Sequence, residues 1–158
     1  MKYRKLVLGA MLAALSCTTA VLFPIPSGAG YIFLTDGFVL LAGWILGPKY
    51  GAASAGIGAV LSDIFTPNVV YAPASFVIKT IMVLIVCCFK SKLLGGILAE
   101  IWMVLGYFLY AWLCLFGNIV MPLTSALGNT AQGAAGLLIG LMLYRSFQNS
   151  KLSKEDEA

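Results

Sequence analysis

Long runs of apolar residues, separated by short polar, glycine-rich or proline-containing breaks, fill the chain from residue 3 to residue 147. Each run predicts a helix, because proline lacks the amide donor and disfavours helix in the residue before it. The expected helices cover residues 3–23, 35–47, 50–65, 73–89, 93–117 and 125–147. The second and third are shorter than the roughly 20 residues that a membrane crossing needs. We therefore expect them to lie at an angle within the bundle, or in a locally thinned bilayer.

Composition identifies the solvent of these helices as lipid. Of the 158 residues, 61% are hydrophobic and 10% are charged, and the mean hydropathy is +0.97. A soluble domain has about 25% charged residues, so this chain has too few polar side chains to cover a surface in water. The sequence predicts an all-α integral membrane protein, a bundle of six transmembrane helices over residues 1–147, followed by a polar cytoplasmic tail over 148–158. A soluble enzyme is excluded.

The N-terminal segment imitates a secretory signal, because Lys2, Arg4 and Lys5 precede an apolar run. Residues 14–17, which end in Cys17, also suggest lipoprotein processing. The apolar run continues to Phe23, however, which is too long for a cleaved segment. We interpret it as a first helix that is retained.

The positions of lysine and arginine predict the orientation. Nine of the ten basic residues lie before the first helix, in the second and fourth connections, or at and beyond the end of the last helix. The opposite connections, residues 24–34, 66–72 and 118–124, contain neither lysine nor arginine. Because basic residues are retained on the cytoplasmic side, both termini are expected in the cytoplasm. The same distribution explains the net charge of +4 without nucleic acid as a partner.

Four ionisable residues fall inside the predicted membrane domain: Asp36, Asp63, Lys79 and Glu100. A charge within a bilayer is costly unless it is paired or hydrated, so each marks a candidate functional position. Asp63 and Lys79 lie at similar depths in the outer half, and we expect them to pair. This pair either contacts a ligand or only fixes two helices together. Asp36 is expected to cap the N-terminus of its helix.

Further polar side chains suggest a ligand pocket. Glu100, Met103, Tyr107, Ala111 and Cys114 share one face of the fifth helix, and Asn129 and Gln132 are neighbours on the sixth. Such groups either bond between helices or, with apolar walls, bind a small polar aromatic ligand. The predicted substrate-binding residues are Tyr31, Asp63, Tyr71, Lys79, Glu100, Tyr107, Asn129 and Gln132.

Several kinds of chemistry have no support in the sequence. The chain has no histidine, and its four cysteines lie in apolar runs without metal-ligand spacing, so we expect no metal, no cofactor and no catalytic residue. It contains no GxxxxGK[ST] phosphate loop. Two alternatives to a binding subunit stay open: a stand-alone proton-coupled transporter or channel with Asp63, Lys79 and Glu100 as a relay, and a structural membrane subunit.

Small residues spaced four apart predict close helix contacts. The pairs are Ala10 and Ala14, Ala52 and Gly56, and Gly136 and Gly140. Small residues let helix backbones approach where lipid gives no hydrophobic drive. The latter two pairs are expected to pack within the chain. The first helix is instead expected to present Gly9, Ala10, Ala13 and Ala14 to a partner protein.

The chain as a whole resembles the S components of energy-coupling factor (ECF) vitamin transporters. The segments that carry the resemblance are GYIFLTDGFVLLAG at 30–43, LGPKYG at 46–51, APASFVIK at 72–79, GYFL at 106–109 and GNTAQG at 128–133. Within that family the chain looks most similar to the subgroup assigned to hydroxymethylpyrimidine or pyridoxine. One departure is Thr35, where glycine is expected before the aspartate.

The resemblance implies a substrate-binding subunit of an ABC-type importer that captures a small aromatic vitamin or precursor with high affinity. It implies as partners a transmembrane coupling protein and two cytoplasmic ATPases, which supply the energy. Family S components dock on the coupling protein through small residues of the first helix, which Ala10 and Ala14 match here. The loop that carries Tyr31 is expected to cover the site.

Overall fold

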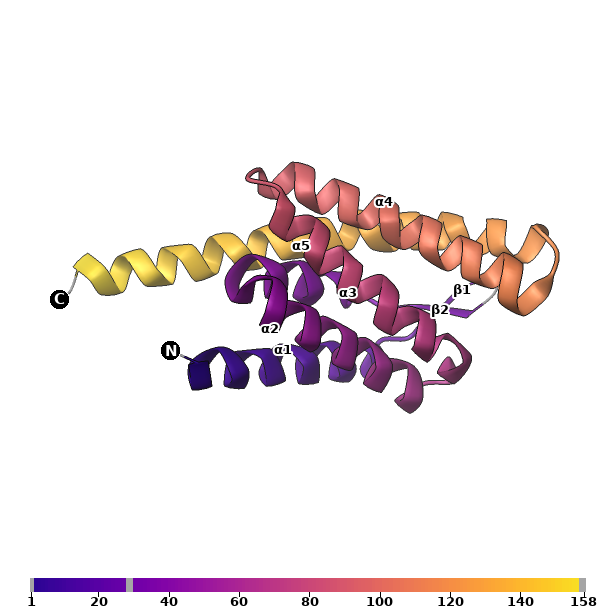
Figure 1. Ribbon diagram of the computed structural model, residues 1–158, viewed down its shortest axis with the longest axis horizontal. Helices are drawn as coiled ribbons and strands as arrows, with labels where there is room; N and C mark the ends of the chain where they lie inside the picture. Colours follow the sequence, from indigo (N-terminus) through magenta and orange to yellow (C-terminus); the bar gives the residue numbers. More distant parts are fainter. Residues whose placement is uncertain (1, 28–29, 157–158) are drawn as a thin grey trace.

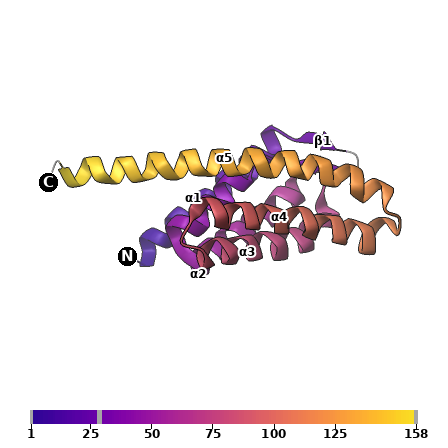
Figure 2. The same cartoon turned by 90° about the horizontal axis from the view of Figure 1, so that it is seen from above.

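The computed structural model describes residues 2–27 and 30–156, and within them helices account for nearly all of the chain. Five α-helices run lengthwise in one bundle, with both ends of the chain at one end of it and a short β-hairpin toward the other (Figures 1 and 2). The helices are α1 (Lys2–Leu22), α2 (Asp36–Phe65), α3 (Ala72–Cys88), α4 (Lys92–Tyr110) and α5 (Val120–Asp156). Two short helices connect them, the 3₁₀ turn η1 (Val69–Tyr71) and the π-helix η2 (Ala111–Phe116).

Helix α2 is bent sharply at Gly47, which divides it into residues 36–46 and 48–65. Gly47 has φ +79° and ψ −176°, outside the helical region, and only glycine adopts this conformation without strain. Pro48 follows it and starts the second segment. The two segments fold back on each other, because a side chain on Gly51 would begin only 2.7 Å from the carbonyl oxygen of Ala42. The predicted break between the second and third helices is therefore confirmed as a bend.

Helix α2 is the centre of the bundle. It packs against α1, α3 and α5, and α4 packs between α3 and α5. The main apolar core joins Leu40 of α2, Met82 and Val83 of α3, and Met103 of α4, all completely shielded from solvent. A second cluster packs Leu12 of α1 against Leu41 and Leu46 of α2.

The outer surface of the bundle is apolar. Leu113, Leu127 and Met142 have relative exposures of 69%, 74% and 67%. Such side chains are stable when lipid surrounds them, and water would disfavour so large an apolar surface. Within the described residues, four helical stretches are long and apolar enough to cross a membrane: Tyr3–Leu22, Val69–Cys88, Lys92–Phe116 and Val120–Ser150. The membrane-embedded, helical architecture is thus confirmed, whereas the count of six crossings stays a prediction.

The structure departs from the predicted elements at two places. Residues 24–34 were expected only as a connection between helices, but β1 (Ile25–Ser27) and β2 (Gly30–Ile32) pair antiparallel with Pro26 opposite Tyr31. The last helix was expected to end at residue 147, with the polar tail at 148–158 beyond it. Instead α5 continues to Asp156 and extends past the bundle in Figure 2.

Small residues pack helices within the chain, as predicted for two of the three pairs. Gly140 of α5 lies against the Gly37 carbonyl and Leu40 of α2, and Gly56 lies against Phe76 of α3. The third pair, Ala10 and Ala14 on α1, is exposed. Gly9 and Ala13 face inward instead: the Ser54 hydroxyl donates to the Gly9 carbonyl at 2.6 Å, and Ala13 lies against Gly58. Of the four residues predicted to form a docking face, Ala10 and Ala14 are therefore accessible, whereas Gly9 and Ala13 are buried against α2 and cannot belong to it.

We predict that Gly136→Ala destabilises the protein by about 1–3 kcal/mol, the usual cost of overpacking a core. A side chain there would begin 2.5 Å from Cβ of Asp36, an atom that cannot move aside. The measurement is thermal unfolding of the purified protein in detergent. Gly9→Ala is the matched control. Its new methyl group would be 3.6 Å from its nearest neighbours, an ordinary contact distance, and the substitution raises helix propensity by the same amount as Gly136→Ala. Equal unfolding temperatures for the two variants would contradict the close α2–α5 contact.

Candidate functional site

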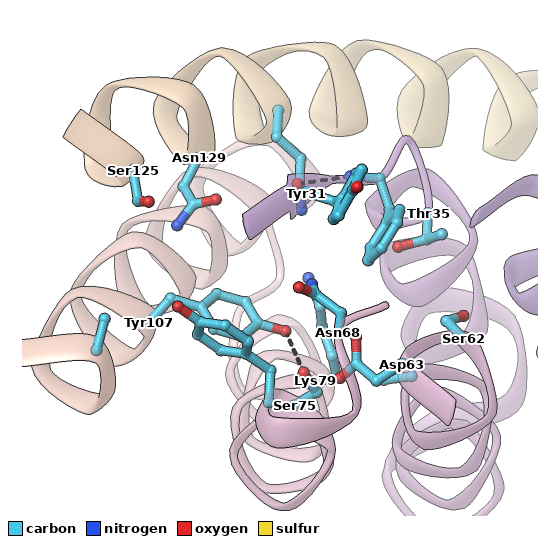
Figure 3. A pocket seen from close by; sticks show the side chains of 15 residues that line it. Tyr31, Thr35, Ser62, Asp63, Asn68, Ser75, Lys79, Tyr107, Ser125 and Asn129 are labelled. Carbon is cyan, nitrogen blue, oxygen red and sulfur yellow. Dashed lines mark hydrogen bonds between the residues drawn. The ribbon is translucent and has the colours of Figure 1, made fainter. Parts of the chain in front are cut away.

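A pocket lies between β2 and the facing parts of α2, α3, α4 and α5 (Figure 3). Its empty volume, which includes the space open to solvent at its mouth, is about 600 Å³. Every helix except α1 contributes to it, together with β2. Its lining consists of Tyr31, Phe33, Thr35, Ala59, Ser62, Asp63, Asn68, Tyr71, Ser75, Lys79, Tyr107, Ala111, Ser125, Asn129 and Gln132.

The floor of the pocket contains a buried ion pair that the sequence did not predict. Lys79 of α3 pairs with Asp36 of α2, and their side chains are 4% and 0% exposed. The second oxygen of Asp36 accepts a hydrogen bond at 2.7 Å from the side-chain amide of Gln132 on α5. Both oxygens of Asp36 therefore have partners, and the pair joins three helices at one level.

Two predictions about these charges are wrong. Lys79 was expected to pair with Asp63, but its ammonium group contacts Asp36. Asp36 was expected to cap its helix, but Thr35 is the N-terminal flanking residue and no side-chain cap forms there. In the low dielectric of the bundle a lysine requires a counter-charge, and the side chain of Asp36 is turned toward α3 to provide it.

Gln132 links the ion pair to the hairpin. Its amide group donates to Asp36, so its carbonyl oxygen is directed away, and this oxygen accepts a hydrogen bond of 3.0 Å from the backbone amide of Phe33. Phe33 directly follows β2, so the segment carrying Tyr31 is held over the pocket by an α5 side chain. Figure 3 shows Tyr31 and Thr35 across the cavity from Tyr107.

Aromatic rings form one wall of the pocket. Tyr71 of η1 and Tyr107 of α4 have their ring centroids 6.2 Å apart at an interplanar angle of 65°, an edge-to-face contact. The Tyr107 hydroxyl donates to the hydroxyl of Ser75 at 2.8 Å, and the ammonium of Lys79 lies 5.5 Å from the centre of the Tyr107 ring. These contacts fix the orientation of Tyr107 before any ligand enters.

Asp63 lines the pocket and has a carboxyl oxygen that can still accept a hydrogen bond. Its side chain is only 3% exposed, and Ser75 and Asn68 line the same pocket. Its Oδ2 atom, however, has no hydrogen-bond partner within the described part of the chain. A buried acceptor without a partner costs about 1–3 kcal/mol, so a ligand donor that reached it would be favoured.

Seven of the eight predicted binding residues line this pocket, and Glu100 does not. Glu100 is buried one layer below, against Gly133 and Gly136 of α5. The helix face that predicted it is correct for Met103, Tyr107 and Ala111, but Cys114 is exposed. The reason is that residues 111–116 form a π-helix, whose wider turn rotates Cys114 away from the α-helical stripe.

Sequence reasoning missed several lining residues, among them Phe33, Asn68 and Ser75. Asn68 and Ser75 carry the polar side chains typical of turns and first helical turns, so their composition does not distinguish a binding role from a local one. Phe33 was missed because its contribution depends on how the hairpin folds over α5.

Comparisons with known proteins agree with this architecture. A family model described as "ECF-type riboflavin transporter, S component" matches residues 1–149. A solved structure titled "Structure and mechanism of the S component of a bacterial ECF transporter" superposes with a TM-score of 0.77 at 23% identity, over 94% of this chain and 98% of the other. At that identity the likeness shows the fold. A search of curated proteins gave no match.

The ion pair predicts a specific double-mutant result. Lys79→Met leaves Asp36 without its counter-charge, and removing one partner of a buried pair costs about 3–5 kcal/mol. We expect a marked fall in the unfolding temperature in detergent. Adding Asp36→Asn removes the orphaned charge and should recover most of the loss. If the double variant were no more stable than Lys79→Met, Asp36 would not be the partner that matters for stability.

Proposed function

The chain belongs to the ECF-type riboflavin transporter S component family, and we propose that its pocket captures a small aromatic vitamin or vitamin precursor from outside the cell. The family match establishes a multi-pass membrane protein that serves as the substrate-binding subunit of a vitamin importer. The observation that carries the proposal is the pocket itself, where tyrosine rings and a carboxylate oxygen without a partner surround one cavity. Apolar walls with a few placed polar groups suit a small ring compound.

The charges of the pocket further restrict the chemical class of the ligand. Lys79 is already neutralised by Asp36, so it is a poor receptor for an anion. Among the described residues Asp63 forms no salt bridge, and its Oδ2 has no hydrogen-bond partner there and is available to a donor. The ligand we propose therefore carries N–H or O–H donors and no phosphate.

Hydroxymethylpyrimidine and pyridoxine are our first candidates. Each is a single heteroaromatic ring with hydroxymethyl substituents, and the amino group of hydroxymethylpyrimidine is a donor that would suit Asp63. The amides of Asn129 and Asn68, both lining the pocket, would bond the hydroxyl groups. Riboflavin is the second candidate, because the family bears its name and its ring system carries an imide N–H that would also donate to Asp63.

We propose six membrane crossings with both termini in the cytoplasm. Two observations support this topology. The bend at Gly47 converts α2 into an antiparallel pair of segments, which adds two passages to the four long helices. The pocket is lined in part by Tyr31, Asn68 and Tyr71, from the connections that contain no lysine or arginine and would face outward in the plasma membrane of a prokaryote.

The partners we propose are the ECF coupling protein in the membrane and two cytoplasmic ATPases. Ala10 and Ala14 are exposed on α1 beside Leu6, Val7 and Met11, which are 55–59% exposed. This face combines small residues that permit close helix approach with apolar side chains around them. It would form the contact with the coupling protein.

The ligand proposal is tested by calorimetry on the purified chain with hydroxymethylpyrimidine, pyridoxine and riboflavin, and with the phosphate ester of whichever binds. We expect one unphosphorylated compound to bind and its phosphate ester to bind at least tenfold more weakly. Asp63→Asn should weaken binding roughly ten- to hundredfold, the effect of a hydrogen bond to a charged group. Glu155→Gln in the tail is the matched control. Failure of all three compounds would exclude these candidates, and equal binding of the ester would contradict the role of Asp63.

The docking proposal is tested separately in cells that contain the coupling protein and ATPases. Ala14→Trp places a large side chain on the exposed face of α1, so vitamin uptake should fall severalfold or more while calorimetric binding is unchanged. Ala134→Trp, at an exposed alanine of α5, is the control and should leave both intact. Normal uptake by the Ala14→Trp variant would contradict docking through this face.

A further inference from the structure

Glu100 is a buried acid that the ligand pocket leaves unused. Its residue exposure is 7%, and neither carboxyl oxygen has a hydrogen-bond partner within residues 2–27 and 30–156. It lies on α4 where α5 presents only glycine backbone: side chains on Gly133 and Gly136 would begin 3.1 Å from Oε2 and 3.3 Å from Oε1. The two glycines make room for this carboxyl group.

The charged groups around Glu100 do not balance an ionised carboxylate. Asp36 of α2 lies against the same glycine, Gly136, and it repels a second negative charge. The cation that acts on Glu100 is Lys79 of α3, and Lys79 is in contact with Asp36. On α5 the Gln132 amide is likewise used by Asp36, to which it donates a hydrogen bond. One lysine therefore faces two carboxyl groups, and it is committed to one of them.

An ionised carboxylate without a partner in so apolar a setting costs several kcal/mol, and such a group takes up a proton instead. We propose that Glu100 and Asp36 form a buried proton-binding site one layer below the ligand pocket, in which Glu100 holds the proton and Asp36 stays ionised against Lys79. Loss of that proton would create a competitor for Lys79. The floor of the pocket, and through Gln132 the contact with Phe33, would then depend on the protonation of Glu100.

The site is tested without any vitamin, by infrared spectroscopy of the purified protein. We expect a protonated-carboxyl stretch at neutral pH that shifts on exchange into D₂O and disappears in Glu100→Gln. This variant keeps the shape of the neutral acid and needs no proton uptake, so it should fold and, at neutral pH, be at least as stable as the wild type. Absence of the band at neutral pH, or its persistence in Glu100→Gln, would overturn the proposal.

A second variant tests the link to Lys79. In Asp36→Asn the lysine loses its partner and Glu100 becomes the available counter-charge, so the carboxyl band should vanish although Glu100 is present. Retention of the band would show that the two acids do not compete for Lys79, and the shared site would be wrong.

The pH dependence of stability provides an independent measurement. Folding would take up one proton at neutral pH, because glutamic acid is ionised there in the unfolded chain. Stability should therefore decrease as pH rises, by up to about tenfold in the unfolding equilibrium per pH unit, and the Glu100→Gln variant should lose this component. An identical pH profile for wild type and variant would contradict proton binding at Glu100.

Discussion

The buried contact between Lys79 and Asp36 constrains the rest of the structure. Two opposite charges with almost no exposure can remain in an apolar bundle only when they are close and their remaining hydrogen-bonding capacity is used. Asp36 meets that condition through Gln132, which in turn holds Phe33. One electrostatic requirement thus fixes the relative height of α2, α3 and α5, and positions the hairpin over the pocket.

The close approach of α2 and α5 makes that contact geometrically attainable. Gly136 and Gly140 bring α5 against the start of α2, so that the side chain of Gln132, one turn away, reaches Asp36. A larger residue at either glycine would separate the helices and lengthen these hydrogen bonds. The hydrogen bond between Gln132 and Asp36 therefore depends on the close packing of small residues at this helix crossing. This dependence explains why the polar cluster lies beside the glycine-rich part of α5.

The sequence predicted which residues surround the pocket better than it predicted the contacts among them. Apolar runs gave the helices, and seven predicted residues line the pocket. Hydropathy gives the depth of a side chain but not its rotation about the helix axis, and Asp36 and Asp63 lie at similar depth on antiparallel segments of α2. That is why Lys79 was assigned to Asp63 and Asp36 was taken for a helix cap. The position of Cys114 was wrong for another reason, because the stripe assumed a regular α-helix where residues 111–116 form a π-helix. Equally, four-residue spacing on α1 did not reveal that Gly9 and Ala13 face α2 while Ala10 and Ala14 face outward.

The arrangement below the pocket bears on whether the chain could conduct a solute by itself. Leu40, Met82, Val83, Val86 and Met103 are 0–1% exposed and pack together one to two turns beyond the ion pair, on the side away from the mouth. A polar vitamin would have to displace these packed side chains and break the Asp36–Lys79 contact to pass. Interiors packed in this way resist local displacement, and the chain carries no phosphate loop to supply energy. The structure therefore favours a capture subunit, whose release step depends on other proteins, over a stand-alone channel or transporter.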